Sequence, residues 1–392
     1  MGPPDTVVSH LDVRVGLSVG AGNTSIGGGD ALVVSDPSGT ELSRQPEGVA
    51  WRVRPTPTAA GGLVELDQGT TTRREDMLVF RPAVPGRFVR VGTKDYRGEV
   101  WVFRDRTGLT IVNRLGIESY LAGVVSLEIG RRRPDEVEAV KAQAIVSRTF
   151  AVKNLGRWRR DGFDFYPTVA DQVYGGVTAE TPLVWEAVRA TRGVVITFRR
   201  APIDAFFFST CGGRTANGTE IFRNADRTYL QSIDDRDRDG EAYCRASPRF
   251  RWRERWSGEQ LRGILQRTLP AQSGVETQGL GTLRDIRVGR RTGSGRVAVL
   301  DVTFDRRTVE VDGPAVRRVL LSPSGQLLRS NAFMLEAERD GDRLVRLEAQ
   351  GQGAGHGVGM CQWGIIGRAR DGQRYPEMLA AYFPGTTLEP MR

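Results

Sequence analysis

The stretch GQGAGHGVGMCQWG, at residues 351–364, is the most distinctive part of this 392-residue chain. It holds six glycines and surrounds His356, one of two histidines in the whole sequence. Glycine at nearly every second position lets a backbone take positive φ angles and approach another surface closely, at a cost in chain entropy. Because that cost is usually tied to a site, we expect this loop to lie at a functional centre and His356 to contribute to it.

A second distinctive block, YLAGVVSLEIGRRRPDEVEAVKAQAIVSR, occupies residues 120–148. Four shorter motifs follow it along the chain: DQVYGG, FFFSTCGG, GHGVGMCQWG and YFPGT. Together these motifs resemble the SpoIID/LytB family, named after stage II sporulation protein D, over roughly residues 110 to 390. The resemblance implies a protein of the bacterial cell envelope that binds peptidoglycan. The family includes lytic transglycosylases, which cleave the β-1,4 bond between N-acetylmuramic acid and N-acetylglucosamine.

The periodicity of the chain predicts an α+β fold, a mixed β-rich assembly with several helices around a glycan-binding groove. Segments such as LDVRVGLSV, VAWRVRP and EVWVF alternate apolar and polar residues between Gly, Pro, Asn or Asp, as strands do. We therefore divide the chain into a supporting β-rich region at residues 1–110 and a SpoIID-like catalytic region at residues 111–390.

Several helices and one hairpin are predicted in the second region. Pro134 is a good first-turn residue for a helix with an apolar stripe, and Thr181 with Pro182 starts another. Ser257 and Gln260 form a capping box ahead of a further helix. Two helices are expected after the glycine-rich loop, at residues 359–370 and 375–383. The segments VVITF and IDAFFFST, at residues 194–198 and 203–210, read as the two strands of a hairpin.

Glu128 is the candidate catalytic residue. It lies among Val124, Val125, Leu127 and Ile129, and apolar surroundings raise the pKa of a carboxyl so that it can donate a proton near neutrality. The sign of the shift stays open, because three arginines at residues 131–133 would oppose it. Taken alone, a Glu after an apolar run is more often a cap or a surface residue. The resemblance favours catalysis, since the position matches the catalytic glutamate of the family.

The resemblance implies a mechanism with one carboxyl, which first protonates the leaving oxygen and then accepts a proton from the muramic C6 hydroxyl. A conventional glycosidase would instead need a second carboxylate, roughly 5 Å away for retention or 6.5–9.5 Å for inversion. Asp171 is the best candidate for that partner, or else a loop-capping residue. Two alternatives therefore stand: a glycoside hydrolase using Glu128 and Asp171, and a non-catalytic wall-binding enhancer of an N-acetylmuramoyl-L-alanine amidase.

The substrate-binding groups should be neutral hydrogen-bonding side chains, together with cations that could pair with a muramic carboxylate. Lys141 and Arg148 lie seven residues apart on one helix face, where a solvated surface is the alternative reading. We expect the motifs to converge on one groove that holds Glu128. The expected substrate-binding residues are Lys141, Arg148, Gln172, Tyr174, Ser209, Thr210, His356 and Gln362.

Composition sets limits on partners and cofactors. The formal net charge is +9, but 53 of the 56 basic residues are arginines interleaved with acids, so a mixed-charge surface is favoured over nucleic-acid binding. Cys211, Cys244 and Cys361 show no metal-type spacing, so no metal or other cofactor is predicted. A disulfide between the first two and three free thiols are equally compatible with the sequence.

No run of roughly 18 apolar residues is present, and residues 1–4 have no signal-peptide core. The resemblance nevertheless implies an exported protein of the cell envelope. We expect its targeting or anchoring segment to lie outside this sequence. The predicted partners are peptidoglycan glycan strands and a cell-wall amidase, with no nucleic acid.

Overall fold

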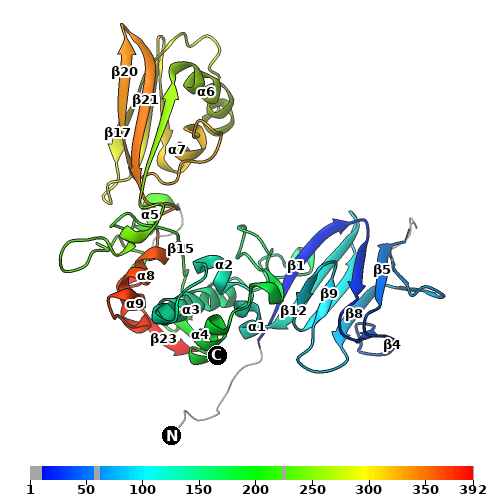
Figure 1. Ribbon diagram of the computed structural model, residues 1–392. Helices are drawn as coiled ribbons and strands as arrows, with labels where there is room; N and C mark the ends of the chain where they lie inside the picture. Colours follow the sequence, from blue (N-terminus) through cyan, green and yellow to red (C-terminus); the bar gives the residue numbers. More distant parts are fainter. Residues whose placement is uncertain (1–10, 57–61, 223–226, 392) are drawn as a thin grey trace. The chain divides into compact units, whose positions relative to one another are not determined.

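The computed structural model describes residues 11–56, 62–222 and 227–391. The start of the chain, where no signal-peptide core was expected, lies outside these residues. The described chain mixes helices and strands and confirms the α+β class (Figure 1). It divides into two compact units: Met1–Thr197 with Ala201–Asp204 and Leu388–Arg392, and Phe198–Arg200 with Ala205–Thr387. The boundary that we placed at residue 110 therefore falls inside the first unit.

The N-terminal part of the first unit is a β-sandwich of two six-stranded sheets, ordered β1-β12-β11-β8-β3-β4 and β10-β9-β2-β5-β6-β7. Within a strand, residues two positions apart are fully buried, such as Val100 and Val102 in one sheet and Val64 and Leu66 in the other. They belong to one core that the two sheets share. This is the period of two that the alternating sequence predicted. The strands are β1 (Asp12–Ala21), β2 (Thr24–Gly27), β3 (Leu32–Ser35), β4 (Glu41–Gln45), β5 (Ala50–Pro55), β6 (Val64–Asp67), β7 (Thr72–Glu75), β8 (Met77–Pro82), β9 (Val89–Val91), β10 (Lys94–Tyr96), β11 (Glu99–Arg104) and β12 (Leu109–Gly116).

The rest of the first unit is mainly helical and begins directly after β12. Its elements are α1 (Ile117–Ala122), α2 (Val125–Ile129), η1 (Pro134–Glu136), α3 (Val137–Lys153), η2 (Arg159–Asp161), η3 (Gly176–Ala179) and α4 (Pro182–Ala190), with the small sheet β14 (Ala201–Pro202), β13 (Val194–Phe198) and β23 (Thr387–Pro390). Pro134 starts the helical segment and Thr181 caps α4, as predicted. However, α3 is buried around most of its circumference instead of along one stripe. Its many small residues let α1, α2 and α4 pack closely on several sides of it.

The second unit holds two three-stranded antiparallel sheets with α6 and α7 packed against them, as Figure 1 shows. Its apolar core is continuous and includes Trp256, Leu265, Leu300 and Leu347, all at most 1% exposed. The elements of this part are β16 (Arg251–Ser257), α6 (Gly258–Ser273), β17 (Leu283–Arg291), β18 (Val297–Phe304), β19 (Thr308–Asp312), α7 (Gly313–Val319), β20 (Phe333–Asp340) and β21 (Arg343–Gln352). The remaining elements of the second unit are β15 (Phe207–Phe208), α5 (Gly218–Ile221), η4 (Tyr243–Ala246), β22 (Met360–Cys361), α8 (Gln362–Arg370) and α9 (Tyr375–Tyr382).

Two local predictions were wrong in part. The predicted hairpin is limited to β13 and β14, because β15 pairs in parallel with β22, which follows the glycine-rich loop some 150 residues later. For the same reason α8 begins at Gln362 and not near residue 359, since Met360 and Cys361 are used as a strand. The capping box at Ser257 and Gln260 is confirmed. None of the helices in the described residues is both long and apolar enough to span a bilayer.

Gly351 gives a stability prediction for the second unit. It lies opposite Trp252 in the β16–β21 pairing, and a Cβ at this position would overlap the indole ring. Gly351→Ala should therefore lower the free energy of unfolding by about 1–3 kcal/mol through overpacking. Urea unfolding followed by circular dichroism measures the change.

The matched control is Gly263→Ala in α6, where the nearest atom to an added Cβ is the end of the Arg267 side chain at 3.7 Å. Alanine has the higher helix propensity, so this variant should gain about 0.5–1 kcal/mol. A Gly351→Ala protein as stable as the parent would contradict the packing argument.

Candidate functional site

Glu128 lies in the short helix α2, and Gly130 ends this helix with φ +75°. Glu128 is partly buried and lies next to the buried Val124 and Ile129. Oε1 of Glu128 accepts the backbone N–H of Val173 at 3.1 Å. Because Val173 belongs to the DQVYGG motif, the structure brings this predicted loop directly against the predicted catalytic carboxyl.

The DQVYGG loop is held in place by buried tyrosines. The Tyr120 hydroxyl donates to Oε1 of Gln172 at 3.2 Å, and the Tyr174 hydroxyl donates to Oδ1 of Asn113 at 2.7 Å. Gln172 is fully buried, and Tyr174 is 6% exposed. Both were predicted to contact substrate, but their placement favours a supporting role in which they fix the loop that carries Val173.

Asp171 has a buried side chain with several partners. Its Oδ2 accepts the indole N–H of Trp158 at 2.7 Å and the backbone N–H of Tyr166 at 2.8 Å, and its Oδ1 pairs with Arg157 at 3.0 Å. Its side chain is 0% exposed, whereas that of Arg157 is 44% exposed. This arrangement matches the loop-capping alternative that the sequence left open, and it leaves Asp171 poorly placed to activate a water molecule.

The two cations predicted on α3 are both engaged within the first unit. Arg148 has no exposed surface and forms a two-point ion pair with Glu118, at 3.0 Å and 2.6 Å. Its Nη1 also donates to the backbone oxygen of Val194 at 3.1 Å. Lys141 is partly buried and pairs with Glu138 at 2.6 Å. Arg148 therefore joins α3 to α1 and to the strand that follows α4, instead of facing a substrate.

In the second unit, the glycine-rich loop packs through its backbone. Gly353, Gly355, Gly357 and Gly359 all have positive φ angles, from +74° to +106°. A Cβ on Gly357 would lie 2.6 Å from the guanidinium of Arg296, and a Cβ on Gly359 would overlap a backbone oxygen. The sequence predicted that the glycines let the loop backbone approach another surface closely. They do so here, and the surface belongs to the same unit.

His356 uses both ring nitrogens within this loop. Nε2 donates to the backbone oxygen of Phe207 at 2.9 Å, and Nδ1 accepts the backbone N–H of Val358 at 3.1 Å. Three phenylalanine rings surround the imidazole with centroids 5.3–6.1 Å away. Burial lowers the pKa of His356 to about 4, so the ring is neutral at physiological pH. These contacts favour a role in fixing the loop to β15.

The other predicted residues of the second unit lie around the same loop. Oγ1 of the buried Thr210 is 2.7 Å from Oγ of Ser247, and the backbone oxygen of Ser209 accepts the N–H of Trp363 at 3.0 Å. Gln362, at the start of α8, is 8% exposed. The structure therefore brings Ser209, Thr210, His356 and Gln362 into one neighbourhood. Their shared groove with Glu128 stays a prediction.

Three cysteines that the sequence did not connect meet in the second unit. The sulfur atoms of Cys211, Cys244 and Cys361 are buried and lie within 4.8 Å of one another. Cys361 caps α8, and its sulfur accepts N–H groups from Cys211 at 3.1 Å and Gly364 at 3.2 Å. The sulfur atoms of Cys211 and Cys244 are 3.5 Å apart, so these residues are thiols and not a disulfide.

Asp235 adds a carboxylate to this cysteine cluster, since its Oδ2 lies 3.2 Å from the sulfur of Cys211. That carboxylate is already paired with Arg368 at 3.0 Å and accepts the Tyr382 hydroxyl at 2.8 Å. The three thiols are therefore the described residues best suited to hold a metal, because zinc is commonly bound by cysteine sulfur. Sequence spacing could not find the cluster, because its cysteines are 33 and 150 residues away from Cys211.

The chain is similar to proteins of one known family. The family model described as Stage II sporulation protein (SpoIID) matches residues 105–198, the segment that carries Glu128 and the DQVYGG loop. This segment is therefore similar to the SpoIID family. A second model, a domain of unknown function (DUF8618), matches residues 237–359, which end within the glycine-rich loop.

Individual relatives extend this similarity over more of the chain. The chain is 28% identical over 300 residues to a stage II sporulation protein D of Bacillus subtilis, covering 72% of this chain and 77% of the relative. It is 29% identical over 296 residues to an uncharacterized protein of Brachyspira hyodysenteriae, covering 75% and 72%. An amidase enhancer of Bacillus subtilis is 26% identical over 284 residues, which cover 64% of this chain and 38% of that protein.

The buried pair of Arg148 and Glu118 predicts a stability effect. Arg148→Met should lower the free energy of unfolding by about 3–5 kcal/mol, because it leaves Glu118 without its partner in a largely buried setting. Lys141→Met, which breaks the more exposed pair, should cost at most about 1 kcal/mol. Urea unfolding of both variants gives the comparison. If Arg148→Met were as stable as the parent but bound glycan more weakly, Arg148 would instead be a substrate-binding residue.

His356 predicts a pH dependence with a defined sign. The folded protein keeps His356 neutral down to a pKa of about 4, whereas the unfolded chain takes up the proton near 6.5. Stability should therefore fall as the pH drops from about 6.5 to about 4. His356→Gln should show a shallower fall over this range, although it is less stable at pH 7 after losing its ring contacts. Unfolding midpoints in urea measured from pH 4 to 8 test this, and equal slopes would contradict it.

Proposed function

We propose that this chain is a lytic transglycosylase that cleaves the bond between N-acetylmuramic acid and N-acetylglucosamine in peptidoglycan. Glu128 is the proposed acid and base. Support comes from its place in the segment matched by the SpoIID model, and from its partly exposed position beside buried apolar residues. The cell-wall function that the sequence motifs imply supports a glycan strand as the substrate.

One carboxyl is sufficient for the proposed reaction. Protonated Glu128 donates its proton to the glycosidic oxygen as the bond from that oxygen to C1 of the muramic sugar breaks. The carboxylate left behind then accepts the proton of the C6 hydroxyl, whose oxygen bonds to C1. The products are a free hydroxyl on N-acetylglucosamine and a 1,6-anhydro-muramic end. No water is consumed, and Glu128 regains its proton.

The burial of the Asp171 side chain is the observation that favours this proposal over a glycoside hydrolase. A hydrolase needs a second carboxylate that faces the sugar, as nucleophile or as base for water. Asp171 instead has a fully buried side chain bonded to Trp158, Tyr166 and Arg157. The Val173 N–H, by contrast, stabilises the charged form of Glu128 that arises after proton donation.

The proposed reaction places the protein outside the cytoplasm, in the cell envelope, where glycan strands are found. A second candidate is a non-catalytic enhancer of a cell-wall amidase, which the resemblance to a protein named amidase enhancer favours. The two candidates differ in turnover and not in glycan binding. An amidase would be a partner in both: it would remove stem peptides before cleavage in the first, and it would be the enhanced enzyme in the second.

The central prediction concerns Glu128→Gln. The amide preserves shape but cannot transfer a proton, so the variant should bind glycan while its turnover falls by about 10²–10⁴. Purified peptidoglycan, intact or pretreated with an amidase, is digested, and its glycans are analysed by mass spectrometry. Ends of 1,6-anhydro-muramic acid are expected from the parent protein, with amidase-treated material preferred.

Glu186→Gln is the matched control, because Glu186 is an exposed carboxylate on α4 in the same unit. This variant should cleave like the parent. Reducing ends that carry a water oxygen would move the reaction to a hydrolase. Binding without cleavage by the parent, on either substrate, would assign the chain to the amidase enhancers.

A further inference from the structure

A cavity rich in arginine lies in the second unit and is lined by residues outside the segment that the SpoIID model matches. It has a volume of about 790 Å³, which is in the range of ligand pockets. It is bounded by the start of β16, the turn between β17 and β18, and the paired ends of β20 and β21. Its lining includes five arginines and no aspartate or glutamate among the described residues: Arg214, Arg251, Arg253, Arg291 and Arg296. We call it the arginine pocket.

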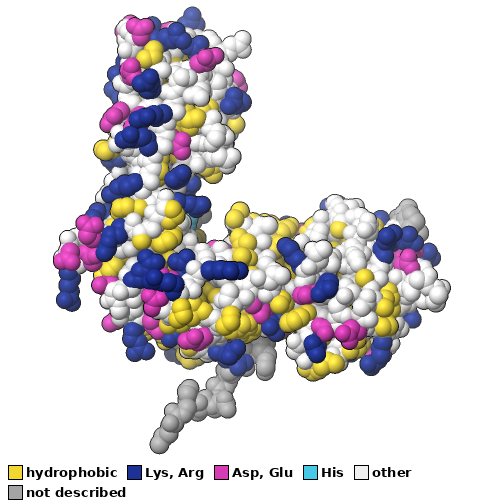
Figure 2. Space-filling model, in the orientation of Figure 1, with side chains coloured by type: hydrophobic (Ala, Val, Ile, Leu, Met, Phe, Trp, Pro, Cys, Tyr) yellow, Lys and Arg dark blue, Asp and Glu magenta, His cyan; other side chains and the backbone are white. Residues whose placement is uncertain are grey.

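The charges of the arginine pocket are only partly neutralised. Arg253 pairs with Glu348 at 2.9 Å, and the exposed Arg214 lies 3.7 Å from Asp234. The other three have no ion pair with any described residue. Arg251 donates to the side-chain amide of Gln352, and Arg291 donates to backbone oxygens. Figure 2 shows further basic side chains, all of them arginines in this part of the sequence, over the surface around β20 and β21.

Arg296 is the most informative member of the pocket. It is 3% exposed, and its two terminal nitrogens donate only to the Ser294 hydroxyl at 3.3 Å and to a backbone oxygen at 3.2 Å. The nearby carboxylate of Glu220 is itself bonded to the backbone N–H of Ser294. A guanidinium buried without a carboxylate partner is costly, so its presence calls for an anion from outside the chain.

Two buried N–H donors in this lining also have no acceptor. They are Nε of Arg296 and the indole nitrogen of Trp252, which is 6% exposed. Each buried donor without a partner costs about 1–3 kcal/mol, and such atoms are rare in folded proteins. Both donors belong to residues that line one cavity, so its wall has hydrogen-bonding capacity that the described chain does not use. Phe333 and the 61% exposed Met334 add an apolar wall beside these donors.

We propose that the arginine pocket binds an oxyanion group, a carboxylate or a phosphate, carried by a polymer of the cell wall. The planar fork of a guanidinium matches both groups with two parallel hydrogen bonds. Two sources have this chemistry: the carboxylates of peptidoglycan stem peptides and the phosphodiesters of wall polymers. The apolar wall would contact the carbon chain that carries the anion.

An anion in this pocket also bears on the glycine-rich loop. The guanidinium of Arg296 lies against the backbone of Gly357, so close that a Cβ at that position would be 2.6 Å from it. An anion that fixes Arg296 would therefore stabilise the loop that carries His356. The pocket lies mostly within residues 237–359, the domain of unknown function, and gives that domain a wall-anchoring role separate from cleavage at Glu128.

Binding experiments with the full chain test the proposal. Isothermal titration calorimetry is performed with a soluble muramyl pentapeptide, with short poly(glycerol phosphate), and with chitotetraose as a neutral glycan. Binding of the first probe identifies carboxylates as the ligand, and binding of the second identifies phosphodiesters. In either case, added salt should weaken the interaction. Because the readout is binding to probes without a scissile muramic bond, it is independent of turnover at Glu128.

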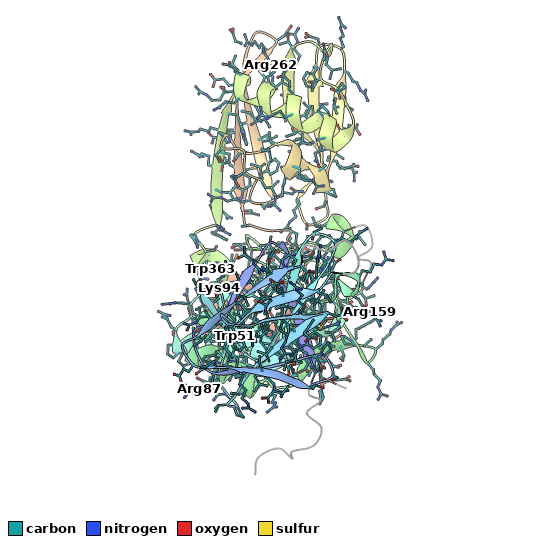
Figure 3. The ribbon with its side chains drawn as sticks, turned by 90° about the vertical axis from the view of Figure 1, so that its right-hand side faces the viewer. Trp51, Arg87, Lys94, Arg159, Arg262 and Trp363 are labelled. Carbon is teal, nitrogen blue, oxygen red and sulfur yellow. The ribbon has the colours of Figure 1, made fainter. Side chains whose placement is uncertain are left out.

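Arg251→Gln and Arg291→Gln are the test variants, since both side chains are exposed at the pocket and their loss should not prevent folding. Each should weaken binding of the anionic probe by about tenfold or more, the value of one charge-assisted hydrogen bond. Arg262→Gln is the control, because Arg262 lies on the exposed face of α6 and does not line the pocket (Figure 3). No binding of either anionic probe would overturn the proposal, as would binding that neither test variant weakens.

Discussion

The close approach of backbone to backbone at the glycine-rich loop is the constraint on which much of the second unit depends. The loop runs from the end of β21 into β22, and β22 pairs in parallel with β15, so the loop joins segments that are far apart in the sequence. Side chains at Gly357 and Gly359 would collide with Arg296 and with the chain before β15. His356 completes the contact by bonding to backbone on both sides of its ring.

Buried polar groups have a comparable part in the first unit. The pair of Arg148 and Glu118 connects α3 to α1, and Tyr174 connects the DQVYGG loop to β12 through Asn113. These residues are costly to bury and are each satisfied by specific partners, which specifies one arrangement of the helices around α2. The result is a rigid setting for Glu128, with the Val173 N–H placed on its carboxyl. A catalytic acid benefits from such a setting, because its orientation is fixed before substrate arrives.

The two units therefore combine a candidate reaction centre with candidate binding surfaces of different chemistry. Glu128 lies next to the buried Val124 and Ile129, with Asp171 withdrawn into the fold. The arginine pocket has a different character, with positive charge that the chain neutralises only in part. Peptidoglycan offers partners for both, since it has a neutral sugar backbone and anionic substituents.

The sequence by itself determined the local structure and the candidate acid. Alternating apolar residues predicted the strands of the sandwich, and capping residues at Thr181 and Ser257 predicted two helix starts, because these signals act between neighbours in the chain. The motifs also predicted that the DQVYGG loop belongs with the segment of Glu128. What a motif residue does within its loop did not follow, because burial depends on what packs against it. Arg148, Gln172 and Tyr174 were expected at a surface and are buried.

Only the tertiary structure decided the long-range features. The parallel pairing of β15 with β22, the cluster of Cys211, Cys244 and Cys361, and the unpaired charge of Arg296 all depend on segments that are distant in sequence. Periodicity and spacing cannot predict such contacts, since they describe only the order of residues along one stretch of chain. The hydrophobic effect is non-directional, so it brings apolar segments together without specifying which polar groups meet. Packing and hydrogen bonding in the folded state determine which polar groups come into contact.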